Sequence, residues 1–190
     1  MTGIPEITDN LRSRGIRFTD KLTEYELRRI ESVYDIIFPP SLRRFYSCGI
    51  PYAEKVDLFP RWTDLSEENI AAIKKRMGQP YEWLLISVKS GFWLRQWGDR
   101  PDGQSEAEKR FRETISAAPV LIPIYSHRYM PVLDDTDDPP VISTVGRDTI
   151  IYGRDLSDYL HHEFIAGVGY HSDKEAAPIP FWSDVIGYGD

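Results

Sequence analysis

Apolar residues recur at three- and four-residue intervals in the first part of the chain, which predicts a series of amphipathic helices. One helix is expected to begin after Thr23, because the Thr23 hydroxyl and the Glu26 side chain can form a capping box. Its apolar face is predicted to carry Leu27, Ile30, Tyr34 and Ile37, and Pro39-Pro40 is expected to stop it. The other predicted helical segments share this spacing or a capping signal: 5–14, 41–47, 66–77 with a stop at Gly78, 80–88 beginning at Pro80, one capped by Ser105 with Glu108, and one capped by Asp155.

The pattern changes after residue 119, where short runs are rich in β-branched and aromatic residues. They predict strands at 120–125, 128–132, 141–145 and 149–152, with a hairpin turn at Gly146-Arg147-Asp148. Helices followed by strands indicate an α+β fold with a largely antiparallel sheet flanked by several helices, in a single domain spanning 1–190. Residues 165–177 are expected to form a loop, and 179–182 to pack back onto the body.

Charge is divided unevenly along the chain, whose formal net charge is −7. Residues 119–190 contain four Lys and Arg against twelve Asp and Glu. The negative electrostatic field of this part of the chain repels nucleic acid and anionic membranes and attracts a basic protein partner. The same charge can also serve simply to keep a surface soluble. Cys48 is the only cysteine, the N-terminus lacks the pattern of a signal peptide, and no apolar run approaches the ~20 residues needed to span a bilayer. We therefore expect a cytoplasmic protein.

Motifs for catalysis, cofactors and metals are weak in this sequence. It has neither a G-x-S-x-G elbow nor a G-x-x-x-x-G-K phosphate loop, so we expect no cofactor and no catalysis. His161 and His162 are adjacent and would point about 100° apart on a helix, so a metal site is not expected there. The acidic run that begins at Asp134 does not fit a calcium loop, because proline stands where the loop requires glycine.

Two segments are candidates for binding a partner. Asp134, Asp135, Asp137 and Asp138 form either a solvated loop or the contact for a basic partner; acid–base chemistry is not favoured, because a catalytic pair needs unequal burial and these four look equally exposed. The segment 91–101 mixes Trp93 and Trp97 with arginines. Such a mixture is typical of interface hot spots, and equally of tryptophans packed beneath a loop.

Several motifs in order resemble one known family: LTEYE at 22–26, FPPSLRRF at 38–45, FW at 92–93, WGDRP at 97–101, LIPIYSHRY at 121–129, PVIS at 140–143, DTIIYG at 148–153, DLSDYL at 155–160 and IPFW at 179–182. Together they resemble the SUKH superfamily, the Smi/Knr-like group, over a core of about 22–164, with 165–190 as a tail that packs back. The sequence departs from the usual family pattern at two loop positions. Ser126 stands where the family usually has Gly, and Asp138-Pro139-Pro140 replaces Gly-Asn-Pro.

The resemblance implies an α+β binding domain without catalysis, and for bacterial members an immunity protein that neutralises a toxin, often a nuclease. The motif residues would then be structural: Trp97, Arg100, His127, Arg128, Tyr129 and Tyr152. We expect the four aspartates to steer a basic toxin domain and an exposed Trp93 or Trp97 to anchor it. An adaptor for cell-envelope or signalling proteins is the alternative binding role. A small-molecule enzyme using His127 and Tyr129 is the rival from another class, and it would need a deep pocket with convergent polar groups.

Overall fold

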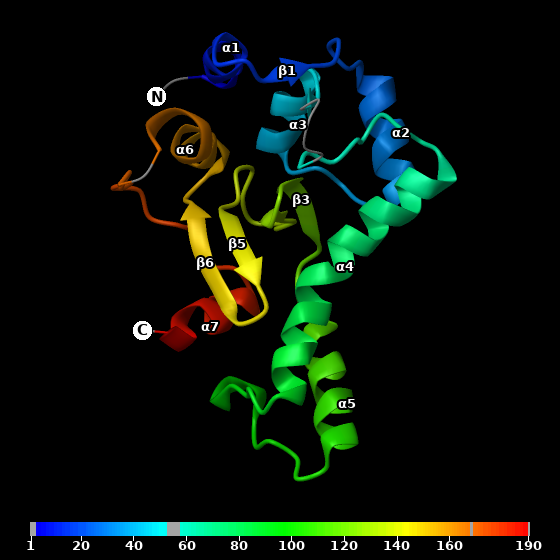
Figure 1. Ribbon diagram of the computed structural model, residues 1–190, viewed down its shortest axis with the longest axis vertical. Coiled ribbons are helices and arrows are strands. Elements are labelled where there is room, and N and C mark those ends of the chain that lie inside the picture. The colour runs from blue at the N-terminus through cyan, green and yellow to red at the C-terminus, as the bar shows by residue number, and fades with distance from the viewer. Residues whose placement is uncertain (1–2, 53–57, 168, 190) are drawn as a thin grey trace.

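A computed structural model describes residues 3–52, 58–167 and 169–189 of the chain, so residues 1, 2, 53–57, 168 and 190 of the predicted domain and tail lie outside the described residues. The fold is α+β, as predicted (Figure 1). Four antiparallel strands pair in sequence order: β3 (Leu121–Tyr125), β4 (Arg128–Pro131), β5 (Val141–Val145) and β6 (Asp148–Gly153). Two short strands, β1 (Arg17–Phe18) and β2 (Pro51–Tyr52), form a separate pair.

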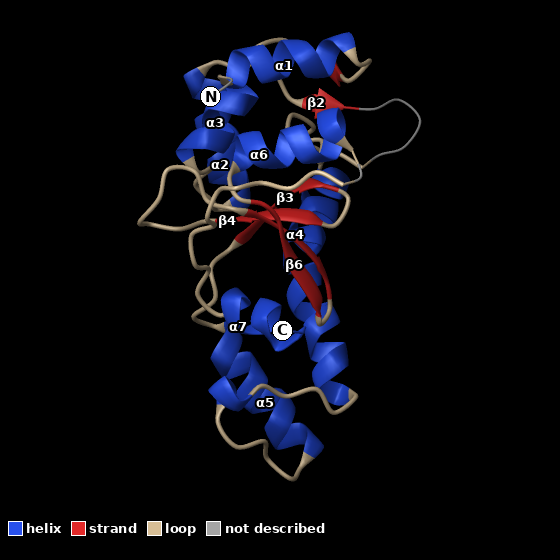
Figure 2. Ribbon diagram, turned by 90° about the vertical axis from the view of Figure 1, so that its left-hand side faces the viewer, coloured by secondary structure: helices blue, strands red, loops and turns tan. Residues whose placement is uncertain are grey.

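Helices cover the four-stranded sheet from both sides (Figure 2). Their bounds are α1 (Ile4–Ser13), α2 (Glu24–Tyr34), α3 (Pro40–Ser47), α4 (Glu67–Lys89), α5 (Gln104–Ile115), α6 (Leu156–His161) and α7 (Trp182–Ile186), with short turns at η1 (Arg95–Trp97), η2 (His162–Ala166, a π-helical segment) and η3 (Gly187–Gly189). Helices α1, α2, α3 and α6 lie on one side of the sheet, and α5 and α7 on the other, while α4 runs past the sheet from one group to the other (Figures 1 and 2).

Successive strand residues enter two different hydrophobic cores. Ile122 packs into the cluster beneath α1–α3 and α6, whereas its neighbour Leu121 packs into the cluster beside α5 and α7. Val141 and Ile142 divide in the same way. Alternate side chains of a strand point to opposite faces, so the continuous apolar runs in the sequence reflect a sheet that is buried on both faces.

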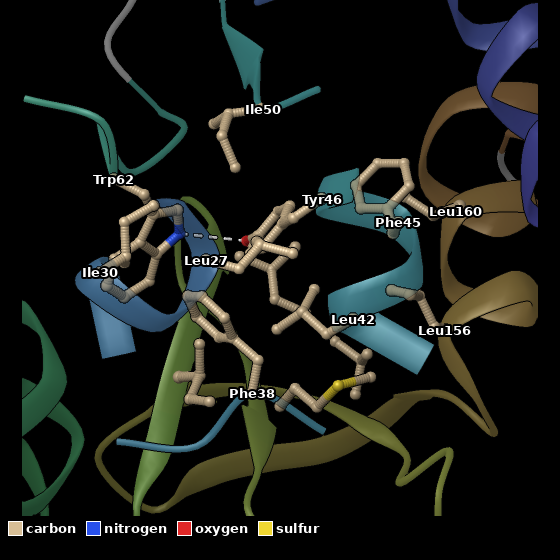
Figure 3. Packing of buried hydrophobic residues seen from close by; sticks show 14 of the residues in the cluster. Leu27, Ile30, Phe38, Leu42, Phe45, Tyr46, Ile50, Trp62, Leu156 and Leu160 are labelled. Atoms are coloured by element: carbon tan, nitrogen blue, oxygen red, sulfur yellow. Dashed lines mark hydrogen bonds between the residues drawn. The ribbon is translucent and has the colours of Figure 1, made fainter. Parts of the chain in front are cut away.

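The first core is built on aromatic contacts between segments that are distant in sequence (Figure 3). Trp62 lies edge-on to Phe38, with ring centroids 5.3 Å apart, and its indole N–H donates to the Tyr46 hydroxyl at 3.1 Å. Burial raises the pKa of Tyr46. The indole bond therefore gives a buried hydroxyl the partner that it needs inside an apolar core.

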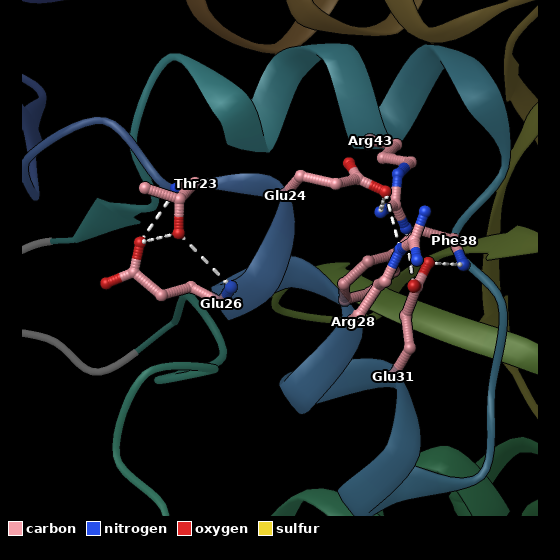
Figure 4. Close-up of polar contacts among 7 residues, drawn as sticks. All are labelled: Thr23, Glu24, Glu26, Arg28, Glu31, Phe38 and Arg43. Atoms are coloured by element: carbon pink, nitrogen blue, oxygen red, sulfur yellow. Dashed lines mark hydrogen bonds and ion pairs between the residues drawn. The ribbon is translucent and has the colours of Figure 1, made fainter.

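The capping box of α2 is confirmed, but the end of that helix is not where the sequence placed it. Glu26 N–H donates to Thr23 Oγ1 at 3.3 Å, and Thr23 N–H donates to the Glu26 carboxylate at 2.7 Å (Figure 4). The helix ends at Tyr34, because Asp35 adopts the left-handed conformation with φ = 54°. The prediction that Ile37 belongs to the buried face is therefore wrong, and its side chain is 73% exposed.

Helix α4 corrects a second prediction, since it continues through Gly78 and Pro80 instead of stopping between them. Proline has no N–H, so Pro80 leaves the carbonyl of Arg76 without its usual helical partner. The Tyr129 hydroxyl, from strand β4, donates to that carbonyl at 3.2 Å. The two halves of α4 then pack into different cores, with Ile73 in the first and Leu84 in the second.

Two further predictions differ from the structure. The first is the loop expected at 165–177, whose first two residues belong to η2. The expected Ser105–Glu108 capping box is absent: α5 begins at Gln104, after Gly103, and Glu108 instead pairs with Lys89 at 3.3 Å. The prediction that residues 179–182 pack back is confirmed, because Ile179 and Trp182 are completely buried in the second core. Among the described helices, none has the length and apolar character required to cross a membrane.

Candidate docking surface

The loop between β4 and β5 presents three exposed carboxylates. Asp134, Asp135 and Asp137 are exposed, and within the described residues none of them has an ion-pair partner. Asp138 differs from them, because it is half-buried and its Oδ1 accepts the Leu156 N–H at 3.0 Å. Burial raises the pKa of Asp138, although the Leu156 N–H opposes that effect. The expectation of four equally exposed aspartates is therefore wrong, and Asp138 ties the loop to the start of α6.

Backbone hydrogen bonds fix both ends of this loop. Val132 N–H donates to the Val120 carbonyl at 2.9 Å, beyond the paired residues of β3 and β4. At the other end, Ser41 N–H in the first turn of α3 donates to the Asp137 carbonyl at 2.9 Å. The exposed aspartates thus lie on the segment that connects the sheet to α3.

A shallow groove of about 420 Å³ lies at the sheet end of the loop. It is lined by Glu31, Ser32, Asp35, Ile36, Ile37, Val120 and Val132. Ile37 and Val120 are 73% and 46% exposed, so two β-branched apolar side chains face solvent in one groove. Asp134 is only two residues from Val132, which places its Cα within about 7.6 Å of the Val132 Cα.

The two acidic side chains of the groove differ in what they bind. Glu31 is already engaged, because it pairs with Arg43 and accepts the Phe38 N–H at 2.9 Å (Figure 4). Asp35 is exposed and has no ion-pair partner in the described part of the chain. Ile37, Val120, Asp35, Asp134, Asp135 and Asp137 together are called the docking surface below.

The tryptophans of the 91–101 segment do not belong to this surface. Trp97 is only 6% exposed and stacks parallel on Phe181, with ring centroids 5.7 Å apart, so the expectation of Trp97 as an exposed anchor is wrong. Trp93 is half-buried, and its indole N–H donates to the Gly98 carbonyl at 2.8 Å. Both lie near α5, at the opposite end of the molecule from α3 (Figure 1).

Two of the motif residues, Arg128 and Tyr152, come together on the sheet. The Arg128 guanidinium lies 3.8 Å from the centre of the Tyr152 ring and pairs with Glu163 at 3.0 Å. The ring of His162 stacks on Tyr152 at 4.2 Å. Arg128 also donates to the Ser143 hydroxyl at 2.9 Å. This column of stacked and ion-paired side chains connects β4, β5 and β6 to the segment that follows α6.

The other motif residues lie apart from this column. Tyr129 is buried on the opposite face, with its hydroxyl committed to α4. His127 lies in the β3–β4 turn, where its Nδ1 is 3.0 Å from the Ser126 hydroxyl, and burial lowers its pKa. Ser126 has φ = 48°, a conformation that glycine adopts without strain. Arg100 contacts Gln104 at 3.3 Å.

Comparison with models of protein families, with curated proteins and with solved structures finds no match for this chain. The function is therefore inferred from the arrangement of residues in this chain. In the ranges that the structure describes, no three His, Cys, Asp or Glu side chains are grouped to hold a metal ion. The docking surface combines apolar and anionic groups, which is chemistry for holding another molecule.

Sequence reasoning found the acidic loop but missed the apolar half of the docking surface. Ile37 was assigned to a buried helix face because its spacing fits that face. The signal against this assignment is Asp35, since aspartate is one of the few residues that tolerates the left-handed conformation. Val120 is exposed only because the sheet ends beside it, and no local sequence pattern predicts this exposure.

Proposed function

We propose that this protein is a non-catalytic binding protein that holds a basic protein domain on the docking surface. The observation that supports the proposal is the groove itself, in which Ile37 and Val120 face solvent beside Asp35, a carboxylate that has no ion-pair partner among the described residues. An apolar centre with a charged rim is the usual composition of a protein interface.

The two kinds of residue have different effects on binding. Unpaired carboxylates attract a cationic partner over distances up to the Debye length, about 8–10 Å at physiological salt, and so raise the association rate. Ile37 and Val120 become buried only in the complex, and burying such a side chain is worth about 1.5–3 kcal/mol. Removal of the aspartates should therefore slow association, whereas removal of Ile37 should speed dissociation.

The partner that fits this chemistry best is a basic toxin domain. Two features support this: the motifs resemble the SUKH superfamily, whose bacterial members are thought to be immunity proteins, and nuclease toxins carry positive charge for binding phosphate. Neutralisation then follows from occlusion, with about 1,200–2,000 Å² of buried surface. An adaptor role would use the same surface for envelope or signalling proteins.

The proposal is tested by capture from native lysate at low and then high salt. Three baits are compared: the wild-type chain, the triple variant Asp134→Asn, Asp135→Asn, Asp137→Asn, and a matched control with Glu67→Gln, Glu68→Gln and Glu113→Gln on exposed positions of α4 and α5. We expect one stoichiometric basic protein that the wild type and the control retain, and that salt or the aspartate variant releases.

Binding kinetics with the purified partner then separate the contribution of the aspartates from that of Ile37. The aspartate variant should lower the association rate and flatten its dependence on salt, while Ile37→Ser should raise the dissociation rate by about tenfold or more. Several envelope or signalling proteins among the captured species would favour the adaptor role. Equal retention of one partner by all three baits would contradict the proposal.

A further inference from the structure

The segment that presents Ile37 to the docking surface is held by a single residue, Glu31. The Glu31 carbonyl accepts the N–H of Ile36 at 3.0 Å, directly after α2 ends. The Glu31 carboxylate reaches further along the same segment and accepts the Phe38 N–H at 2.9 Å (Figure 4). Ile36 and Phe38 are buried on either side of the exposed Ile37. Glu31 therefore fixes the backbone immediately before and after the apolar side chain that the docking surface presents.

The Glu31 carboxylate keeps this position because Arg43 holds it. One terminal nitrogen of the Arg43 guanidinium pairs with Glu31, and the other pairs with Glu24 at 2.6 Å (Figure 4). The side chains of Arg43 and Glu31 are only 23% and 11% exposed, so water and salt screen their attraction less than that of a surface pair. Without Arg43, a largely buried carboxylate would lose its counterion, and it would favour a rotamer that returns its charge to water.

Arg43 lies in α3, and the first turn of that helix also holds the acidic half of the docking surface. The Ser41 N–H donates to the carbonyl of Asp137 at 2.9 Å. The helix is itself anchored, since Leu42 and Phe45 are buried in the first core. The apolar and the acidic halves of the docking surface thus take their positions from neighbouring residues of one helix.

We propose that Glu31 and Arg43 are positioning residues of the docking surface, which act on the partner through Ile37. Their opposite charges neutralise each other, so the pair adds little to the attraction of a cation; its effect is to hold Ile37 in the orientation that a partner meets. A side chain that is fixed before binding loses less conformational entropy on binding. The consequence for binding rests on the proposed function, but the ordering of Ile37 is a property of the free protein.

The ordering of Ile37 is tested on the full chain without a partner. Hydrogen exchange of the Phe38 amide and the NMR signals of the Ile37 methyl groups are measured in Arg43→Met and Glu31→Ala. We expect the Phe38 amide to exchange about five- to tenfold faster in both variants, the effect of losing one hydrogen bond, and the Ile37 signals to shift. Arg28→Met is the matched control and should change neither. Arg28 pairs with the same Glu24, at 2.8 Å, and within the described residues it has no ion pair with Glu31.

Conservative variants separate positioning from a general loss of packing. Glu31→Gln keeps an acceptor oxygen for the Phe38 N–H, and Arg43→Lys keeps the positive charge. Each should therefore recover part of the protection that Glu31→Ala or Arg43→Met loses. Thermal unfolding is measured in parallel, and exchange is compared between variants that remain folded. A Phe38 amide that exchanged at the wild-type rate in both Arg43→Met and Glu31→Ala would overturn the proposal.

The consequence for binding is tested with two synthetic peptides with blocked ends, Lys-Lys-Leu-Lys-Lys and Lys-Lys-Ser-Lys-Lys. They carry the same charge, so the ratio of their dissociation constants reports the apolar contact rather than the attraction by the aspartates. We expect the wild type and Arg28→Met to prefer the leucine peptide by about tenfold, and Arg43→Met by about threefold or less. In an Ile37→Ser background the preference should be lost, and Arg43→Met should change nothing further.

The outcomes distinguish this positioning role from the proposed function. A leucine preference that Arg43→Met leaves at the wild-type value, or an equal effect of Arg43→Met with and without Ile37, would overturn the positioning role and leave the docking surface intact. No preference in the wild type would contradict the proposed function, and the exchange rate of the Phe38 amide would then decide the positioning role alone.

Discussion

At the residue scale, Tyr129 completes a helix to which it does not belong. Its hydroxyl donates to the Arg76 carbonyl, which Pro80 leaves unpaired. We expect Tyr129→Phe to lower the free energy of unfolding by about 1–3 kcal/mol, because the part-buried carbonyl then loses the donor that replaces the missing proline N–H. Urea unfolding measures this loss. Tyr25→Phe, at an exposed tyrosine, is the control and should have no effect.

A double-mutant cycle isolates the cause of this loss. Pro80→Ala restores a backbone N–H that can bond to the Arg76 carbonyl, so Tyr129→Phe should cost less in that background than in the wild type. An equal cost in both backgrounds would show that the hydroxyl stabilises the fold in some other way.

Asp138 is the residue whose ionisation most directly opposes folding in the acidic loop. Burial raises its pKa, so its ionisation is less favourable in the folded than in the unfolded chain, and stability is lost as pH rises through the folded value. Asp138→Asn keeps an oxygen for the Leu156 N–H and removes the charge. The variant should gain stability relative to the wild type between about pH 4 and pH 7, with no gain below the ordinary pKa of about 3.9.

The measurement is urea unfolding across that pH range. Asp134→Asn, which changes an exposed aspartate of the same loop, should show no pH-dependent difference. Asp138→Ala removes the acceptor as well as the charge and should cost about 1 kcal/mol, as the loss of a helix cap does. A variant Asp138→Asn that becomes less stable than the wild type as pH rises would contradict the assignment of a burial penalty.

At the element scale, the sequence predicts those features that depend on neighbouring residues. The cap of α2 by Thr23, the cap of α6 by Asp155 and the turn between β5 and β6 each need only a few consecutive residues. Helix α4 shows where this reasoning fails. Gly78 is a local stop signal and Pro80 a local start signal, but the residue that compensates for the proline inside the continuous helix is Tyr129, which comes from the sheet.

The docking surface likewise includes features that the sequence predicts and features that depend on distant parts of the chain. The acidic loop is visible in the sequence as a run of aspartates, but which of them is structural depends on the Leu156 N–H. Trp97 is buried because Phe181 returns from the far end of the chain to stack on it. The groove requires α2 to end beside the last residues of the sheet, so Ile37 and Val120 could be paired only in three dimensions.

At the scale of the whole molecule, two hydrophobic cores share one sheet and one helix. The strands send alternate side chains into the two cores, and α4 contributes Ile73 to one and Leu84 to the other. The two cores pack on opposite faces of one sheet, so loss of packing in one core also destabilises the sheet on which the other core packs. This connection predicts that the chain unfolds as a single cooperative unit.

Hydrogen exchange tests this cooperativity when one core residue is truncated at a time. Leu42 and Leu84 are both completely buried, the first in the core beneath α1–α3 and the second in the core beside α5 and α7. Each leucine-to-alanine change should cost about 2–5 kcal/mol, and that cost should lower the opening free energy of protected amides equally in α3 and in α7. Ile150→Ala, at a half-exposed strand position, should change neither. If Leu84→Ala destabilised only the amides of α5 and α7, the second core would be an independent unit, and α4 would be a connection between two domains rather than a shared element of one.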